Sequence, residues 1–191
     1  MHKKTILLLI ILTIFSNLLE AKFIGAFAPD KKVGNISLST GQAKINSQST
    51  SIYSLDFGGN YYYKNGIMWG SIFSLGYIQN PDTTVDSKVM AELSGKFKFG
   101  YSFGELARAL SVYALADFSY LMYNTSSINY ITGNQEDSFN SAQGIGSGMG
   151  AEYRFKNNYL VTTSYTSITM TPDDGKNFEY EKILIGLGYS W

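Results

Sequence analysis

The residues of this chain that could do chemistry are charged side chains that stand mostly at alternate positions of apolar segments. Paired carboxylates can act as general acid and base. Here the carboxylates are interspersed with lysine and arginine, so we expect them to form a network of salt bridges on one face of each segment. The residues assigned to this network are Glu92, Lys96, Lys98, Asp117, Glu152, Arg154 and Lys182.

Two residue types that many enzymes need are scarce. The chain has no cysteine, which removes thiolate nucleophiles and cysteine metal sites. Its one histidine is His2, inside a segment that we expect to be cleaved. The mature chain would then lack the imidazole base on which many hydrolases depend. The sequence therefore predicts no catalytic residue, no metal site and no cofactor, and a protein that is not an enzyme.

The first 21 residues have the organisation of a secretory signal. A basic start, Met1–Lys4, precedes an apolar run, Thr5–Phe15, and polar and small residues, Ser16–Ala21. The apolar run is shorter than the roughly 20 residues of a transmembrane helix. We expect cleavage after Ala21, which divides the chain into a signal peptide, 1–21, and one domain, 22–191, outside the cytoplasm.

The remaining residues alternate between large apolar and small or polar side chains. At the C-terminus, Ile183, Ile185, Leu187, Tyr189 and Trp191 share one face, a period of two that indicates a β-strand. Seven further segments show this pattern more or less completely. The expected strands are 22–28, 51–62, 67–78, 88–99, 109–121, 144–155, 159–168 and the C-terminal segment.

The connections between these strands alternate in length. Lys64–Gly66 and Lys156–Asn158 have the composition of tight turns, and Gly100–Arg108 is slightly longer. The other four connections are long and polar: 29–50, 79–87, 122–143 and 169–178. Short turns on one side and long loops on the other are typical of outer-membrane barrels.

Two folds share this alternation, a membrane barrel and a secreted lipocalin-like barrel with its apolar face inside. The charges fit either fold, because they would face the lumen of the first and the solvent around the second. Glycine at alternate positions favours the membrane barrel, since bare glycine gains little on a soluble surface. These glycines are Gly146, Gly148, Gly150, Gly186 and Gly188.

The end of the chain resembles the C-terminal sorting signal of outer-membrane barrels, carried here by Ile185, Leu187, Tyr189 and Trp191. The stretch 146–155, followed by Lys-Asn-Asn, looks like the sixth strand and turn of OmpA-like and OmpX-like barrels. The resemblance implies an all-β fold, an eight-stranded antiparallel up-and-down transmembrane β-barrel without a peptidoglycan-binding domain. It also implies a Gram-negative outer membrane, lipid as a partner, and contact of the C-terminal strand with the barrel-assembly machinery.

Three functional hypotheses remain. The first is a monomeric structural or surface-interaction barrel that contacts an extracellular ligand through loops 29–50 and 122–143. The second is a narrow pore or transporter for small solutes or ions, although eight strands leave an interior that side chains fill. The third is a soluble lipid carrier. Acidic and basic residues are equal in number, 15 each, so no nucleic-acid partner is expected.

Overall fold

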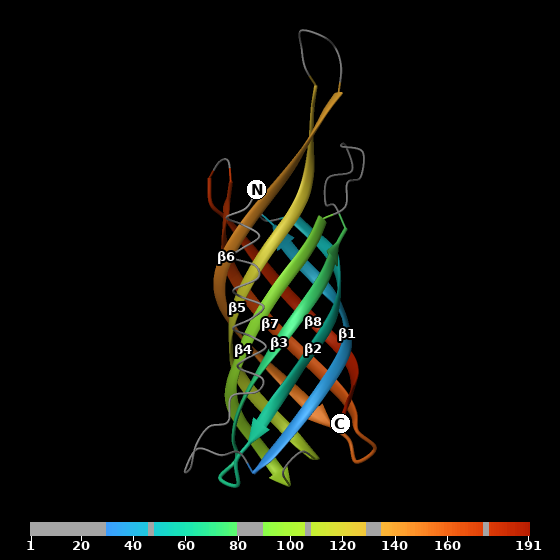
Figure 1. Ribbon diagram of the computed structural model, residues 1–191, viewed down its shortest axis with the longest axis vertical. Coiled ribbons are helices and arrows are strands. Elements are labelled where there is room, and N and C mark those ends of the chain that lie inside the picture. The colour runs from blue at the N-terminus through green and yellow to red at the C-terminus, as the bar shows by residue number, and fades with distance from the viewer. Residues whose placement is uncertain (1–29, 46–47, 80–89, 106–107, 129–134, 174–175) are drawn as a thin grey trace.

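The computed structural model describes residues 30–45, 48–79, 90–105, 108–128, 135–173 and 176–191. They form the strands β1 (Lys31–Ile45), β2 (Gln48–Tyr62), β3 (Ile67–Ile78), β4 (Met90–Glu105), β5 (Arg108–Ile128), β6 (Gln135–Arg154), β7 (Tyr159–Pro172) and β8 (Phe178–Ser190). Each strand pairs antiparallel with the next, and β8 pairs with β1, which closes a barrel (Figure 1). The predicted eight-stranded antiparallel barrel is confirmed.

In the part of the chain that the structure describes, no helix is long and apolar enough to cross a membrane.

The strands are staggered around the barrel. Asn35 of β1 has a partner in β2, that residue has a partner in β3, and so on around the barrel. After one full circuit this series of partners returns to β1 at Ile45, near the other end of the strand. A closed sheet with such an offset must tilt its strands against the barrel axis, as Figure 1 shows. The stagger therefore determines which inward side chains meet across the lumen.

The alternation of the sequence becomes an inside and an outside. Large apolar side chains point outward and are exposed, among them Leu38 and Leu187, each 68% exposed, and Trp191, 67% exposed. Charged side chains such as Glu92 and Lys182 point inward and are buried. A soluble barrel would have the reverse arrangement, so the lipocalin-like alternative is wrong.

The beginning of the barrel differs from the prediction. The expected strand 22–28 lies outside the described residues. The expected loop 29–50 is wrong, because β1 occupies 31–45 and β2 starts at Gln48. The outward face of β1 has only two large apolar residues, Ile36 and Leu38, so its alternation is weak. Its pairing with both β2 and β8 holds it in the sheet.

Two other connections are shorter than expected. Segment 122–143 is mostly strand, because β5 continues to Ile128 and β6 begins at Gln135. Met122 is the last residue of β5 that pairs with β4, and Ala142 is the first residue of β6 that pairs with β7. Beyond these two residues β5 and β6 pair only with each other, and they form a hairpin that projects from the barrel (Figure 1). This stretch of the sequence is rich in Ser, Thr, Asn and Gln and lacks the regular alternation of the other strands, so the two extensions could not be predicted from it. Likewise β4 continues to Glu105 through the expected connection 100–108.

The two predicted tight turns are confirmed. Gly66 has a φ of 88° and Asn158 a φ of 69°, the left-handed conformation for which glycine and asparagine are suited. The backbone amide of Gly66 donates to the carbonyl of Tyr63 at 2.9 Å, and that of Asn158 donates to the carbonyl of Phe155 at 3.1 Å. We call the end of the barrel with these turns the turn side and the opposite end the loop side.

Apolar side chains close the interior near both ends. On β5 the inward residues run from Leu121 on the loop side through Asp117 to Leu115 and Tyr113 on the turn side. Leu121 belongs to the loop-side cluster, Ala43, Ile52, Ile78, Leu121, Ala142, Ile168, Met170, Tyr180 and Leu184. The turn-side cluster is Val33, Tyr62, Met68, Tyr113 and Leu115. The charged residues between them are thus held in an enclosed space.

Candidate functional site

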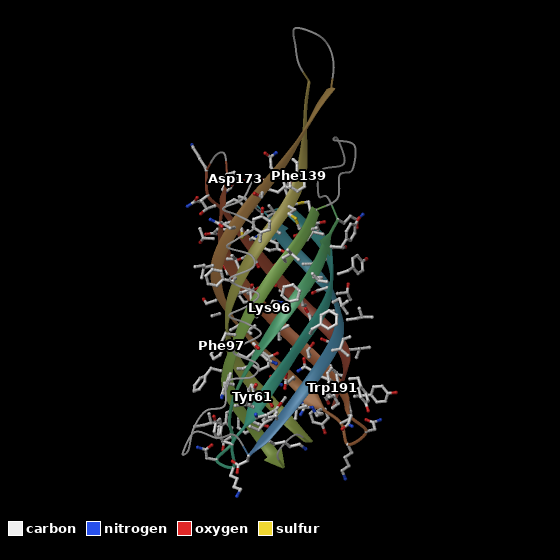
Figure 2. All side chains as sticks on the ribbon, in the orientation of Figure 1. Tyr61, Lys96, Phe97, Phe139, Asp173 and Trp191 are labelled. Atoms are coloured by element: carbon white, nitrogen blue, oxygen red, sulfur yellow. The ribbon has the colours of Figure 1, made fainter. Side chains whose placement is uncertain are left out.

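The seven residues assigned to the charge network all lie in the lumen, each at most 4% exposed. One of them, Lys96, is labelled in Figure 2 and lies about midway along the barrel. They come from β4, β5, β6 and β8, and the structure gathers most of them into two groups around Glu92 and Glu152.

Lys182 is the centre of the first group. Its Nζ lies 2.5 Å from Oε1 of Glu92 and 3.0 Å from Oδ2 of Asp117, so one ammonium bridges two carboxylates. Two hydroxyls complete the group: Ser119 Oγ lies 2.7 Å from Glu92 Oε1, and the hydroxyl of Tyr180 donates to Glu92 Oε2 at 2.9 Å. Buried charges need such pairing, because an unpaired one would be strongly destabilising.

Glu152 is the centre of the second group. Lys98 Nζ donates to its Oε2 at 2.9 Å, and Arg154 Nη2 lies 3.8 Å from its Oε1. The amide of Asn60 and the hydroxyl of Tyr62 donate to Oε1 at 2.6 and 2.8 Å. Both oxygens of this buried carboxylate are therefore occupied.

Asp56 is a lumenal carboxylate that the predicted network does not include. It accepts hydrogen bonds from the hydroxyls of Ser39 and Ser54, both at 2.7 Å, and interacts electrostatically with Lys96. Asp56 is separated from Ser54 and from Asn60 by an even number of positions on β2, so the alternation points its side chain to the same face as theirs, the lumen. Tyr62 stands two residues from Asn60 and Tyr180 two residues from Lys182, so the alternation of β2 and β8 points these two tyrosines into the lumen as well.

The buried charges balance. The described lumen contains four carboxylates, Asp56, Glu92, Asp117 and Glu152, and four cations, Lys96, Lys98, Arg154 and Lys182. The cavity beside Asp56 and Lys98 is about 20 Å³, which suffices for about one water molecule. Such an arrangement can hold strands together.

No metal site is evident among the described residues, where no three acidic or histidine side chains gather. The described residues contain neither histidine nor cysteine.

The four residues assigned to the sorting signal lie on the outer face of the closing strand and just beyond it: Ile185, Leu187, Tyr189 and Trp191. Trp191 exchanges two backbone hydrogen bonds with Gly34 of β1, at 2.9 and 3.0 Å. A Cβ at Gly34 would lie 2.7 Å from the indole of Trp191, so the glycine makes room for this ring. The end of the chain thus contributes to closure of the barrel.

A closed antiparallel barrel with an apolar exterior and a charged, enclosed interior defines the class of membrane-spanning β-barrels. Residues 19–190 match the model of the outer membrane protein beta-barrel domain, and the chain belongs to this family.

Solved structures show the same fold at low sequence identity. Neisserial surface protein A is 14% identical with a TM-score of 0.56, and the alignment covers 83% of this chain and 96% of that one. Ail, the attachment invasion locus protein of Yersinia pestis, was solved with the heparin analogue sucrose octasulfate. It is 13% identical with a TM-score of 0.55, and the alignment covers 84% of this chain and 98% of that one. No curated protein matches the chain closely enough to count as a relative.

Proposed function

We propose that this protein is a non-enzymatic, non-conducting outer-membrane barrel that presents the β5–β6 hairpin outside the cell for contact with a ligand. The observation that carries the proposal is the combination of a closed lumen with a projecting hairpin (Figure 1). A rigid scaffold that displays an extended segment is a common way to build a binding surface. The charge network then serves to hold the scaffold rigid.

Export, lipid contact and assembly are further parts of the proposal. We propose that residues 1–21 direct export and are removed, and that the mature barrel is a monomer surrounded by outer-membrane lipid. The sorting role of Ile185, Leu187, Tyr189 and Trp191 is supported by their place on the outer face of β8, where the assembly machinery could reach them. Of the two segments first proposed for ligand contact, 29–50 is mostly strand in its described part, which leaves segment 122–143.

The ligand differs in character from a sulfated glycan. The described part of the loop side contains five carboxylates, Glu136, Asp137, Asp173, Glu179 and Glu181, against two lysines, Lys44 and Lys176. This surface is therefore not basic. The likeness to Ail supports only the use of an eight-stranded barrel as a scaffold, and a neutral or basic ligand fits this chain better.

Shortening of the hairpin tests the proposal. Tyr123 pairs with Asn140, so replacement of residues 124–139 by Asn-Gly leaves a two-residue hairpin in the same register. Labelled proteoliposomes of the wild type should bind members of a glycan and extracellular-protein array, and the shortened variant should lose that binding. It should still migrate as a heat-modifiable band, because Leu121 and Ala142 of the loop-side cluster are retained. Equal binding by both forms would contradict the proposal.

The pore hypothesis is tested by planar-bilayer recording. We expect a flat baseline from folded protein, because both apolar clusters and the paired charges fill the lumen. A porin incorporated under the same conditions serves as the positive control. Stepwise openings that disappear when the protein is unfolded by heat would favour the narrow pore.

A further inference from the structure

The two ends of the barrel differ in charge. On the turn side, the described exposed charged residues comprise four lysines and one carboxylate, Lys31, Lys32, Lys64, Lys156 and Asp30. On the loop side, by contrast, five carboxylates stand against two lysines among the described residues. The basic surplus is therefore confined to the turn side.

Three of the turn-side lysines are available to an external anion. Asp30 lies 3.6 Å from Nζ of Lys64 and accepts a hydrogen bond from its backbone amide, so Lys64 is compensated. Among the described residues, no carboxylate forms a salt bridge with Lys31, Lys32 or Lys156. We call these three residues the lysine collar.

Aromatic rings place the collar at the depth of lipid headgroups. Lys32 pairs in register with Tyr61, which pairs with Trp69. The Tyr61 and Trp69 rings stack with centroids 4.2 Å apart, and Lys32 Nζ lies 5.6 Å from the Tyr61 centroid. Figure 2 shows Tyr61 toward the turn side, below Phe97. Aromatic belts of membrane proteins lie at the interface between hydrocarbon and headgroups.

The same arrangement recurs elsewhere on the circumference. Lys156 lies in the β6–β7 turn between Phe155 and Tyr159. Phe155 packs edge-on against Tyr153 at 4.8 Å, and Tyr159 against Tyr189 at 6.1 Å. A lysine directly beyond an aromatic ring can reach the phosphate of a lipid while its methylene chain stays on the apolar surface.

We propose that the lysine collar binds the phosphates of anionic phospholipids in the leaflet on the turn side. The anionic lipid surface attracts each adjacent lysine, which corresponds to about a fivefold preference per lysine. Between the collar and the loop side, the outer faces of the strands are uncharged and contribute no such preference. The preference for anionic lipid is therefore confined to the leaflet on the turn side. The proposal does not depend on what the hairpin binds.

The protein contains its own reporters for a test. Its two tryptophans, Trp69 and Trp191, both lie toward the turn side. Their fluorescence is quenched by brominated acyl chains in contact with the barrel. Brominated phosphatidylglycerol or brominated phosphatidylcholine is added, in separate samples, to vesicles of phosphatidylcholine. The ratio of the two quenching efficiencies measures the preference of this end of the barrel for an anionic lipid.

The variant K31Q/K32Q has a matched control in K44Q/K176Q, which removes two lysines from the loop side. We expect the wild type and the control to prefer phosphatidylglycerol several-fold, about fivefold per lysine in contact, and K31Q/K32Q to lose most of that preference. The preference should also fall with added salt. Heat-modifiable migration confirms that each variant is folded.

Three results would overturn the proposal. The first is an unchanged preference in K31Q/K32Q. The second is an equal loss in K44Q/K176Q, which would indicate an effect of overall charge. The third is loss of the preference when inorganic phosphate replaces chloride at constant ionic strength, which would indicate a site for soluble phosphate.

Discussion

Replacement of Lys182 by methionine is expected to lower the free energy of unfolding by about 3–5 kcal/mol. Methionine has a similar volume but no charge, so it leaves Glu92 and Asp117 without their common cation. These carboxylates are 4% and 0% exposed, and water cannot replace the lost ammonium without entry into the lumen. The barrel must then retain uncompensated charge or take up protons.

Unfolding in urea, followed by tryptophan fluorescence in lipid vesicles, measures this effect. Lys44→Met is the matched control, because Lys44 is half exposed and lies 3.8 Å from Glu181, a surface pair that contributes at most about 1 kcal/mol. The double variant D117N/K182M should regain much of the lost stability, since it restores the balance of three buried carboxylates and three buried cations. If K182M were as stable as the control, the first charge group would not hold the barrel together.

Replacement of Gly148 by alanine is expected to destabilise the barrel by about 1–3 kcal/mol, the cost of overpacking a close contact. Gly148 faces the lumen on β6, opposite Thr166 of β7. A Cβ there would lie 1.9 Å from the carbonyl oxygen of Tyr165 and 2.7 Å from Cγ2 of Thr166. Because the first of these atoms belongs to the backbone, the strands themselves would have to move apart.

Gly59→Ala provides the comparison for this variant. Gly59 is also a strand glycine, but its nearest neighbour for a new Cβ is the carbonyl oxygen of Val33 at 3.2 Å. In the same urea titration, Gly59→Ala should lower the free energy of unfolding by less than Gly148→Ala does. Equal stabilities of the two variants would show that β6 and β7 are not in close contact at Gly148.

Much of the fold could be predicted from the residues alone. β3 has the predicted bounds, 67–78, because Trp69, Phe73 and Leu75 mark its outward face clearly. β1 was missed because its outward face is polar beyond Leu38, and an alternation needs two contrasting faces. The turns at Gly66 and Asn158 were predictable because the positive φ restricts which residues fit.

The residue pattern alone predicted most of the strands, the segregation of charges to one face of each strand, and the absence of histidine from residues 22–191. These are local properties, because the period of two comes from the backbone of a single strand. Which face is inside and which charges meet depend on the closed barrel as a whole. Lys182 and Glu92 are 90 residues apart, and their contact depends on the stagger around all eight strands. Closure sets that stagger, and it also brings together the apolar clusters that fill the lumen near both ends.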